Sequence, residues 1–150
     1  MHRWRRLAAA VVILGATTLA SGGPAAGQVL VFMTARGPTH GFTISGTAVT
    51  GLYPGATRRI DLTFSNPYLT PIRVRSVAGR LISTSKRGCR STPANLEVRG
   101  YTGRLPATVP PRSRQNAGHL DVHMPNSVSD ACQNATFTVQ FTGEATEAGR

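Results

Sequence analysis

The sequence predicts an all-β protein, a single antiparallel β-sandwich of six to seven strands that follows an N-terminal signal peptide. Apolar and polar residues alternate in short runs from Phe42 onward, which is the period of a half-buried strand. Turn signals rich in glycine, proline and asparagine separate these runs about every 8 to 12 residues. The 150 residues, of which 40% are hydrophobic and 15% charged, have room for one globular domain.

The first 27 residues have the layout of a secretory signal peptide. A basic stub at residues 2–6 is followed by an uncharged apolar run at residues 7–20, and then by small residues and a proline at residues 21–27. We expect cleavage after Ala20 or near Ala26 and Gly27. The alternative is an uncleaved membrane anchor, but a bilayer needs about 20 apolar residues and Pro24 would break a longer helix.

The leader therefore predicts a chain that is secreted or held at the extracellular face of the cell envelope. No cysteine lies near the cleavage region and no apolar tail closes the chain, so neither a lipid anchor nor a C-terminal anchor is expected. Once the leader is removed, we expect no stable insertion into the membrane.

The body of the chain divides into a lead-in or edge strand at residues 28–41, a sandwich at residues 42–143 and a C-terminal tail at residues 144–150. Pro54 and Gly55 mark the first turn, Asn66 and Pro67 stop the second strand, and Gly79 bends the third. Three prolines predict a loop or irregular edge at residues 104–114. The strands are expected at residues 42–49, 59–64, 71–75 with a continuation at 77–82, 96–101, 119–124 and 136–142.

The apolar positions of these strands predict the core, because residues two apart on a strand share a face. The expected core residues are Ile44, Ile60, Leu62, Phe64, Ile72, Val74, Leu120, Val122, Phe137, Val139 and Phe141.

The two cysteines, Cys89 and Cys132, are expected to form a disulfide. An exported chain meets oxidising conditions, and neither cysteine is flanked by residues with the spacing of metal ligands. Closing the loop between them corresponds to about 4 kcal/mol of stability in the chain-entropy model.

The charge balance favours anionic partners. The formal net charge is +11, and it falls to +8 when Arg3, Arg5 and Arg6 leave with the leader. Such a surface attracts anionic cell-wall polymers or lipid headgroups. Nucleic acid is not expected as a partner of an exported chain, and a solvated basic surface without a ligand is the alternative. The residues expected to form an anion-facing patch are Arg58, Arg59, Arg73, Arg75, Lys86, Arg87 and Arg90.

The run His119-x-Asp121-x-His123 is the one candidate for a metal site. On a strand all three side chains share a face, and two imidazoles with a carboxylate suit iron or zinc. The outer pair of a straight strand lies about 13 Å apart, however, so one ion needs a bend or bulge to reach all three. The alternative is the polar face of a half-buried strand, and no metal or other cofactor is predicted.

No catalytic constellation is visible in the sequence. No serine lies in a G-x-S-x-G turn, and the six carboxylates form no evident acid–base pair. We therefore expect a protein that is not an enzyme, with an unrecognised secreted enzyme as the alternative.

Several short motifs resemble a known group of proteins. Residues 52–55 (LYPG), 60–67 (IDLTFSNP) and 71–74 (PIRV) are similar to the opening strands of bacterial extracellular immunoglobulin-like domains. Residues 132–137 (CQNATF) resemble the last strand of small secreted proteins from GC-rich Gram-positive bacteria, which carry no assigned activity. The resemblance implies an immunoglobulin-like β-sandwich exposed at the cell surface. The export signal, the small disulfide-bonded sandwich and the basic surface, together with the lack of a catalytic motif, predict a structural or binding module there. A small-ligand or metal-binding protein is the alternative.

The first prediction concerns export and the disulfide together. The protein recovered from the culture medium should lack the leader and be lighter than the dithiol chain by the two thiol hydrogens, as measured by intact mass. A full-length chain in the membrane fraction would support the anchor instead.

Overall fold

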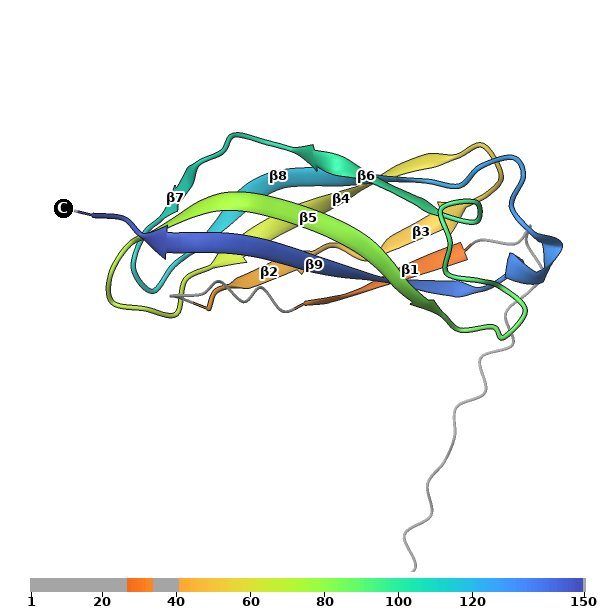
Figure 1. Ribbon diagram of the computed structural model, residues 1–150, viewed down its shortest axis with the longest axis horizontal. Helices are drawn as coiled ribbons and strands as arrows, with labels where there is room; N and C mark the ends of the chain where they lie inside the picture. The colour runs from red at the N-terminus through yellow and green to blue at the C-terminus, as the bar shows by residue number, and fades with distance from the viewer. Residues whose placement is uncertain (1–26, 34–40, 150) are drawn as a thin grey trace, which may run out of the picture.

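The computed structural model describes residues 27–33, as a backbone strand, and residues 41–149. These residues form two β-sheets that pack face to face as a sandwich (Figure 1). The four-stranded sheet has the order β2-β4-β8-β6, with β2 (Thr43–Gly46), β4 (Thr57–Ser65), β8 (Arg114–His123) and β6 (Glu97–Thr102). The five-stranded sheet has the order β3-β1-β9-β5-β7, with β3 (Val49–Leu52), β1 (Gly27–Met33), β9 (Thr136–Glu147), β5 (Ile72–Thr84) and β7 (Ala107–Val109).

The all-β sandwich predicted from the sequence is confirmed. The four-stranded sheet has the spatial order that immunoglobulin constant domains give to strands A, B, E and D, and β5 and β9 then take the places of strands C and F. Within the described residues no helix is long and apolar enough to cross a bilayer. The predicted leader and its alternative as an anchor lie, apart from Gly27, outside the described residues.

The strand count of six to seven is too low, since the described residues form nine strands. Residues 42–49 were expected as one strand, but the chain leaves the four-stranded sheet after β2 and enters the five-stranded sheet as β3. Gly46 allows this crossing, because a Cβ there would lie 2.7 Å from Ile60 and 2.9 Å from Phe141. The irregular segment 104–114 contains the short edge strand β7, and β9 continues to Glu147, which leaves a shorter tail than residues 144–150.

The lead-in also differs from the expectation. Gly27–Met33 is not an edge strand, because β1 lies between β9 and β3. It runs parallel to β9, from Gln28 opposite Thr136 to Met33 opposite Phe141, and antiparallel to β3. All other strand pairs are antiparallel, so β1 occupies the position of an immunoglobulin G strand with the opposite direction. The sequence of residues 27–33 does not show with which strands they pair, because pairing partners lie far away in the chain and leave no local pattern.

The core between the two sheets contains all eleven residues predicted from the alternation, and each of them is at most 1% exposed. Its largest fully buried side chains include Phe64, Phe137 and Phe141. Phe42 packs edge-on against Phe64 with ring centroids 5.8 Å apart, a favoured aromatic geometry. Burial of each such side chain contributes roughly 1.5–3 kcal/mol, so this continuous apolar layer is what holds the sheets together.

Bulges break the strict alternation in both sheets. Between the pairs Asp61–His119 and Thr63–Asn116, β4 advances by two residues and β8 by three, which places an extra residue at Ala117–Gly118. Gly118 has φ +77°, a left-handed conformation that glycine adopts without strain. Tyr101 of β6 donates a hydrogen bond to the Ala117 carbonyl, and burial raises the pKa of its phenol.

A buried asparagine joins the loops at the end of the sandwich where the C-terminus lies. The Asn66 side chain is 2% exposed, and its amide nitrogen donates to the carbonyls of Thr70, Val109 and Pro110 at 2.9, 3.2 and 3.0 Å. Its carbonyl oxygen accepts from the Tyr68 amide at 2.9 Å. The Asn66 amide is therefore satisfied inside the protein and fixes the shape of the loop that follows β4.

The bulge glycine provides the second prediction. Gly118→Ala should lower the free energy of unfolding by about 1–3 kcal/mol, because a Cβ would lie 2.4 Å from the Thr102 carbonyl oxygen on a backbone with positive φ. Gly100→Ala is the matched control on β6, since a Cβ there meets nothing within 4 Å. Urea denaturation of both variants measures the difference, and equal stabilities would contradict this role of Gly118.

Candidate binding surfaces

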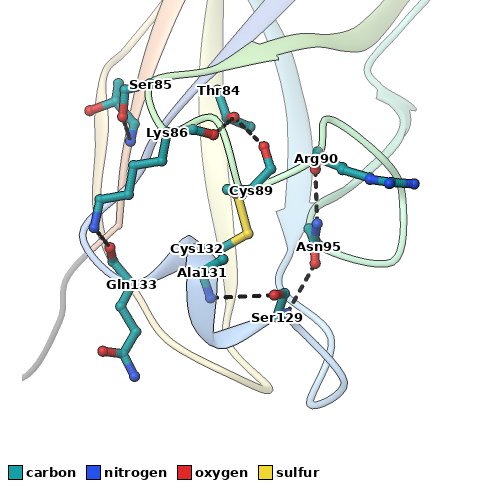
Figure 2. Close-up of a disulfide and its surroundings, with 11 residues drawn as sticks. Thr84, Ser85, Lys86, Cys89, Arg90, Asn95, Ser129, Ala131, Cys132 and Gln133 are labelled. Carbon is teal, nitrogen blue, oxygen red and sulfur yellow. Dashed lines mark hydrogen bonds between the residues drawn. A yellow bond between two sulfur atoms is a disulfide. The ribbon is translucent and has the colours of Figure 1, made fainter.

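The disulfide predicted from the sequence is present and links two loops at one end of the sandwich. Cys89 lies in the loop between β5 and β6, and Cys132 ends the 3-10 turn η1 (Asp130–Cys132) before β9. Figure 2 shows the bond between their sulfur atoms. Cys89 and Cys132 are each 3% exposed. The bridge lies at the margin of the core, where it connects the loop that follows β5 to the 3-10 turn that precedes β9.

Polar contacts surround this bridge and tie the same loops together. Ser85 donates its backbone N–H to the Thr136 carbonyl at 2.9 Å, and its hydroxyl accepts from the Thr136 amide at 2.8 Å. Lys86, in the loop after β5, donates a hydrogen bond from its side chain to the carbonyl of Gln133, which follows η1 (Figure 2). Buried Asn95 accepts from the Ser129 amide at 3.0 Å and donates to the Arg90 carbonyl at 2.9 Å. The loops at this end are thus held by both covalent and hydrogen bonds.

A hollow of about 270 Å³ opens at the disulfide end. Apolar side chains of Leu52, Pro54, Met124 and Val128 line much of it, and Tyr53 stands at its side with 56% of its surface exposed. The Arg58 guanidinium covers the Tyr53 ring at 5.4 Å from the ring centroid. This volume is just below the usual range of small-molecule sites, which is about 300–1,000 Å³.

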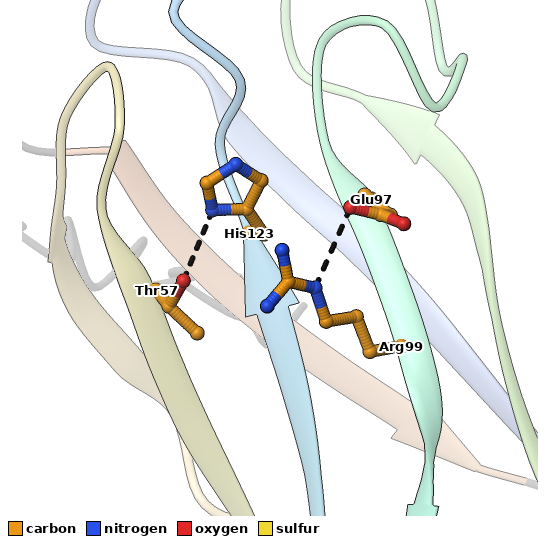
Figure 3. A network of polar contacts seen from close by, with 4 residues as sticks. All are labelled: Thr57, Glu97, Arg99 and His123. Carbon is orange, nitrogen blue, oxygen red and sulfur yellow. Dashed lines mark hydrogen bonds and ion pairs between the residues drawn. The ribbon is translucent and has the colours of Figure 1, made fainter.

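The three residues of the candidate metal site share one face of β8, as the sequence predicts for a strand, and all are half-buried. Each faces a different partner on the neighbouring strand β4: His119 lies opposite Asp61, Asp121 opposite Arg59 and His123 opposite Thr57. The Nδ1 atom of His123 lies 3.0 Å from the Thr57 hydroxyl (Figure 3). Among the described residues no three His, Cys, Asp or Glu side chains gather closely enough to hold a metal ion.

The outer face of the four-stranded sheet therefore consists of matched polar rows. Arg59 is the register partner of Asp121, and Glu97 is the register partner of His123. Arg99 of β6 forms an ion pair with Glu97 at 3.5 Å (Figure 3). Since cations and carboxylates stand side by side, this face carries little unmatched charge.

The seven residues of the predicted anion-facing patch are divided among several parts of the molecule. Lys86, Arg87 and Arg90 lie in the loop that carries Cys89, at the disulfide end. Arg58 covers Tyr53 near the same end, and Arg59 lies on the charge-matched face.

Arg73 and Arg75 lie on the outer face of the five-stranded sheet, on β5, and Arg80 joins them there. Arg73 stands between Thr108 of β7 and Thr146 of β9, and Arg80 lies opposite Gln140. All three arginines are exposed. We call them the β5 arginine face. The sequence prediction missed Arg80, because an extra residue at Arg75–Ser76 shifts the alternation and carries an even-numbered position to the face of Arg73.

Comparison of the chain with models of known protein families, with curated proteins and with solved structures finds no match. The class of molecule is therefore defined by its own architecture, a disulfide-bonded β-sandwich with a basic surface.

The third prediction tests the disulfide. Replacing both cysteines (Cys89→Ala with Cys132→Ala) should lower the free energy of unfolding by up to about 4 kcal/mol, because the bridge restricts the unfolded chain over a sequence separation of 43 residues. Chemical denaturation of the oxidised protein and the double variant measures the change. Reduction of the wild-type protein should give the same midpoint as the variant, and unchanged stability would contradict a structural role for the bridge.

Proposed function

We propose that the chain is an exported, non-catalytic structural or binding module of the cell surface, attracted to anionic polymers of the cell wall. The observation that carries this proposal is that most of the exposed basic side chains form no ion pair within the described residues. Among the described residues the only ion pair is that between Arg99 and Glu97. The exposed basic residues in this part of the chain are Arg59, Arg73, Arg75, Arg80, Lys86, Arg87, Arg90, Arg99, Arg104, Arg112 and Arg114.

Charges without a nearby carboxylate remain available to an external anion. A carboxylate within about 4 Å neutralises much of the field of a guanidinium, whereas an unpaired guanidinium keeps that field and its five N–H donors. Guanidinium groups also bind phosphate and carboxylate in a bidentate manner, which suits phosphate-bearing or carboxylate-bearing polymers. The composition of the surface thus favours a polyanion over a neutral partner.

The β5 arginine face is the best candidate for the contact. The register partners of Arg73 and Arg80 are uncharged, namely Thr108, Thr146 and Gln140. The one carboxylate of β9 that lies beside this face in the described structure is Glu144, opposite Ser76. On the opposite face of the sandwich Arg99 forms an ion pair with Glu97, and Arg59 is the register partner of Asp121. An extended anion therefore finds fewer neighbouring carboxylates on the outer face of the five-stranded sheet than on that of the four-stranded sheet.

The fourth prediction follows from this difference. Binding to purified cell walls should weaken about tenfold or more between about 50 and 500 mM salt, because the Debye length falls well below the spacing of the charges. Arg73→Glu with Arg75→Glu should weaken it further at low salt. A sedimentation assay with isolated walls measures the bound fraction.

The matched control reverses the same number of charges on the other sheet, as Arg59→Glu with Arg99→Glu. This variant should lose less binding than the β5 variant, since both of its arginines already have carboxylate neighbours. Equal losses would place the contact elsewhere than the β5 arginine face. Absence of wall binding at every salt concentration would exclude attachment by charge.

A further inference from the structure

The loops at the end opposite the disulfide present an apolar side chain to solvent. Leu69 is 75% exposed, more than any other large hydrophobic residue in the described part of the chain. Its neighbour Tyr68 packs against the core, so the loop is anchored on one side and projects Leu69 on the other. Figure 1 shows the loop after β4 and the loop before β8 together at the end where the C-terminus lies. A single exposed leucine is common on protein surfaces. Leu69 differs because its loop is anchored to the core and basic residues lie beside it.

Two arginines lie beside it. The backbone N–H of Arg112 donates to the Tyr68 carbonyl at 2.9 Å, and Arg114 is the register partner of Ser65, immediately before this loop. Both arginines are exposed and neither has a carboxylate within ion-pair distance in the described residues. Residues 66–71 and 110–114 contain no Asp or Glu. We call these two segments the Leu69 tip.

The Leu69 tip is also rigid, and part of it is strained. Buried Asn66 joins its two segments through the carbonyls of Val109 and Pro110. Arg112 adopts φ 50°, a left-handed conformation in which glycine or asparagine is the usual residue. An arginine held there against its backbone preference suggests that its side chain has a use outside the fold.

We propose that the Leu69 tip docks on an anionic lipid surface, with Leu69 at the boundary of the hydrocarbon and Arg112 and Arg114 at the headgroup phosphates. A hydrated wall polymer has no apolar phase to receive Leu69, whereas a lipid interface provides an apolar layer beneath a layer of negative charge. Arg73, the second residue of β5, lies beside this end and adds a further cation, while Glu147, opposite Ile72, is the nearby carboxylate. This proposal rests on the export part of the proposed function, and of the residues assigned to wall binding on the β5 arginine face it shares only Arg73.

The expected attachment is weak and reversible. Transfer of a leucine side chain out of water favours binding about tenfold when insertion is partial. Each arginine near an anionic surface adds about fivefold. The product is an enhancement of roughly 10²–10³-fold over a surface that lacks these three side chains, so binding should be measured at millimolar lipid.

The fifth prediction uses tryptophan as a reporter. The single tryptophan, Trp4, lies in the predicted leader, so the chain from Gly27 onward, which carries both sheets, has none. In Leu69→Trp, vesicles of phosphatidylglycerol should shift the emission to shorter wavelength, and lipids brominated on the acyl chain should quench it. Vesicles of phosphatidylcholine should cause neither effect at about 150 mM salt. Ile82→Trp is the control, because Ile82 is 41% exposed but lies on β5 away from the tip.

Two further variants test the roles of the groups by vesicle sedimentation. Leu69→Ser should lower the partition coefficient about tenfold, and Arg112→Gln with Arg114→Gln should lower it about twentyfold. Arg59→Gln with Arg99→Gln, on the charge-matched face, should lower the partition coefficient by no more than about threefold. A loss of that size is what the removal of two positive charges far from the contact would cause. All these side chains are exposed, so folding should be unaffected, as circular dichroism will check.

Two results would overturn the inference: no emission shift in Leu69→Trp, or wild-type partitioning of Leu69→Ser. The second result, with binding still lost in the arginine variant, would mean attachment by charge alone. Failure of vesicle docking with salt-sensitive wall binding intact would remove this inference and leave the proposed function. Loss of wall binding with vesicle docking intact would do the reverse.

Discussion

The pairing of β5 with β9 is the contact on which the other features of the five-stranded sheet depend. The two strands pair antiparallel from Ile72 opposite Glu147 to Thr84 opposite Phe137. Their inward residues enter the core, and β1 and β7 attach to the free sides of β9 and β5. The ladder continues into the hydrogen bonds between Ser85 and Thr136, so the disulfide loops begin where it ends.

The two outer faces of the sandwich carry different charge arrangements, because the stability of the fold comes from the core and does not depend on either face. A buried apolar layer stabilises the fold without help from surface ion pairs, which contribute little when exposed. One outer face can then place cations beside carboxylates, as in the ion pair of Arg99 with Glu97, while the other keeps Arg73 and Arg80 among threonine and glutamine. The two ends differ in the same way, with cross-linked loops at one end and the Leu69 tip at the other.

The alternation of apolar residues determined the fold class and the core. Every predicted core residue is buried, because a residue's place in a period of two reports the face that it occupies. The two cysteines of a predicted exported chain were likewise enough to predict their pairing. Of the surface residues, the sequence identified Arg73 and Arg75 as sharing a face, since no bulge intervenes between them, whereas no sequence pattern singled out Leu69.

Tertiary structure alone decided the rest. The place of β1 beside β9, the crossing between sheets after Gly46, and the nearness of Leu69 to Arg112 all join residues far apart in the chain, and such contacts leave no local pattern. The bulge at Arg75–Ser76 carried Arg80 to the arginine face because one inserted residue reverses the parity of every position after it. The sequence by itself thus determined which residues leave water, whereas long-range pairing and bulges decided which exposed residues meet.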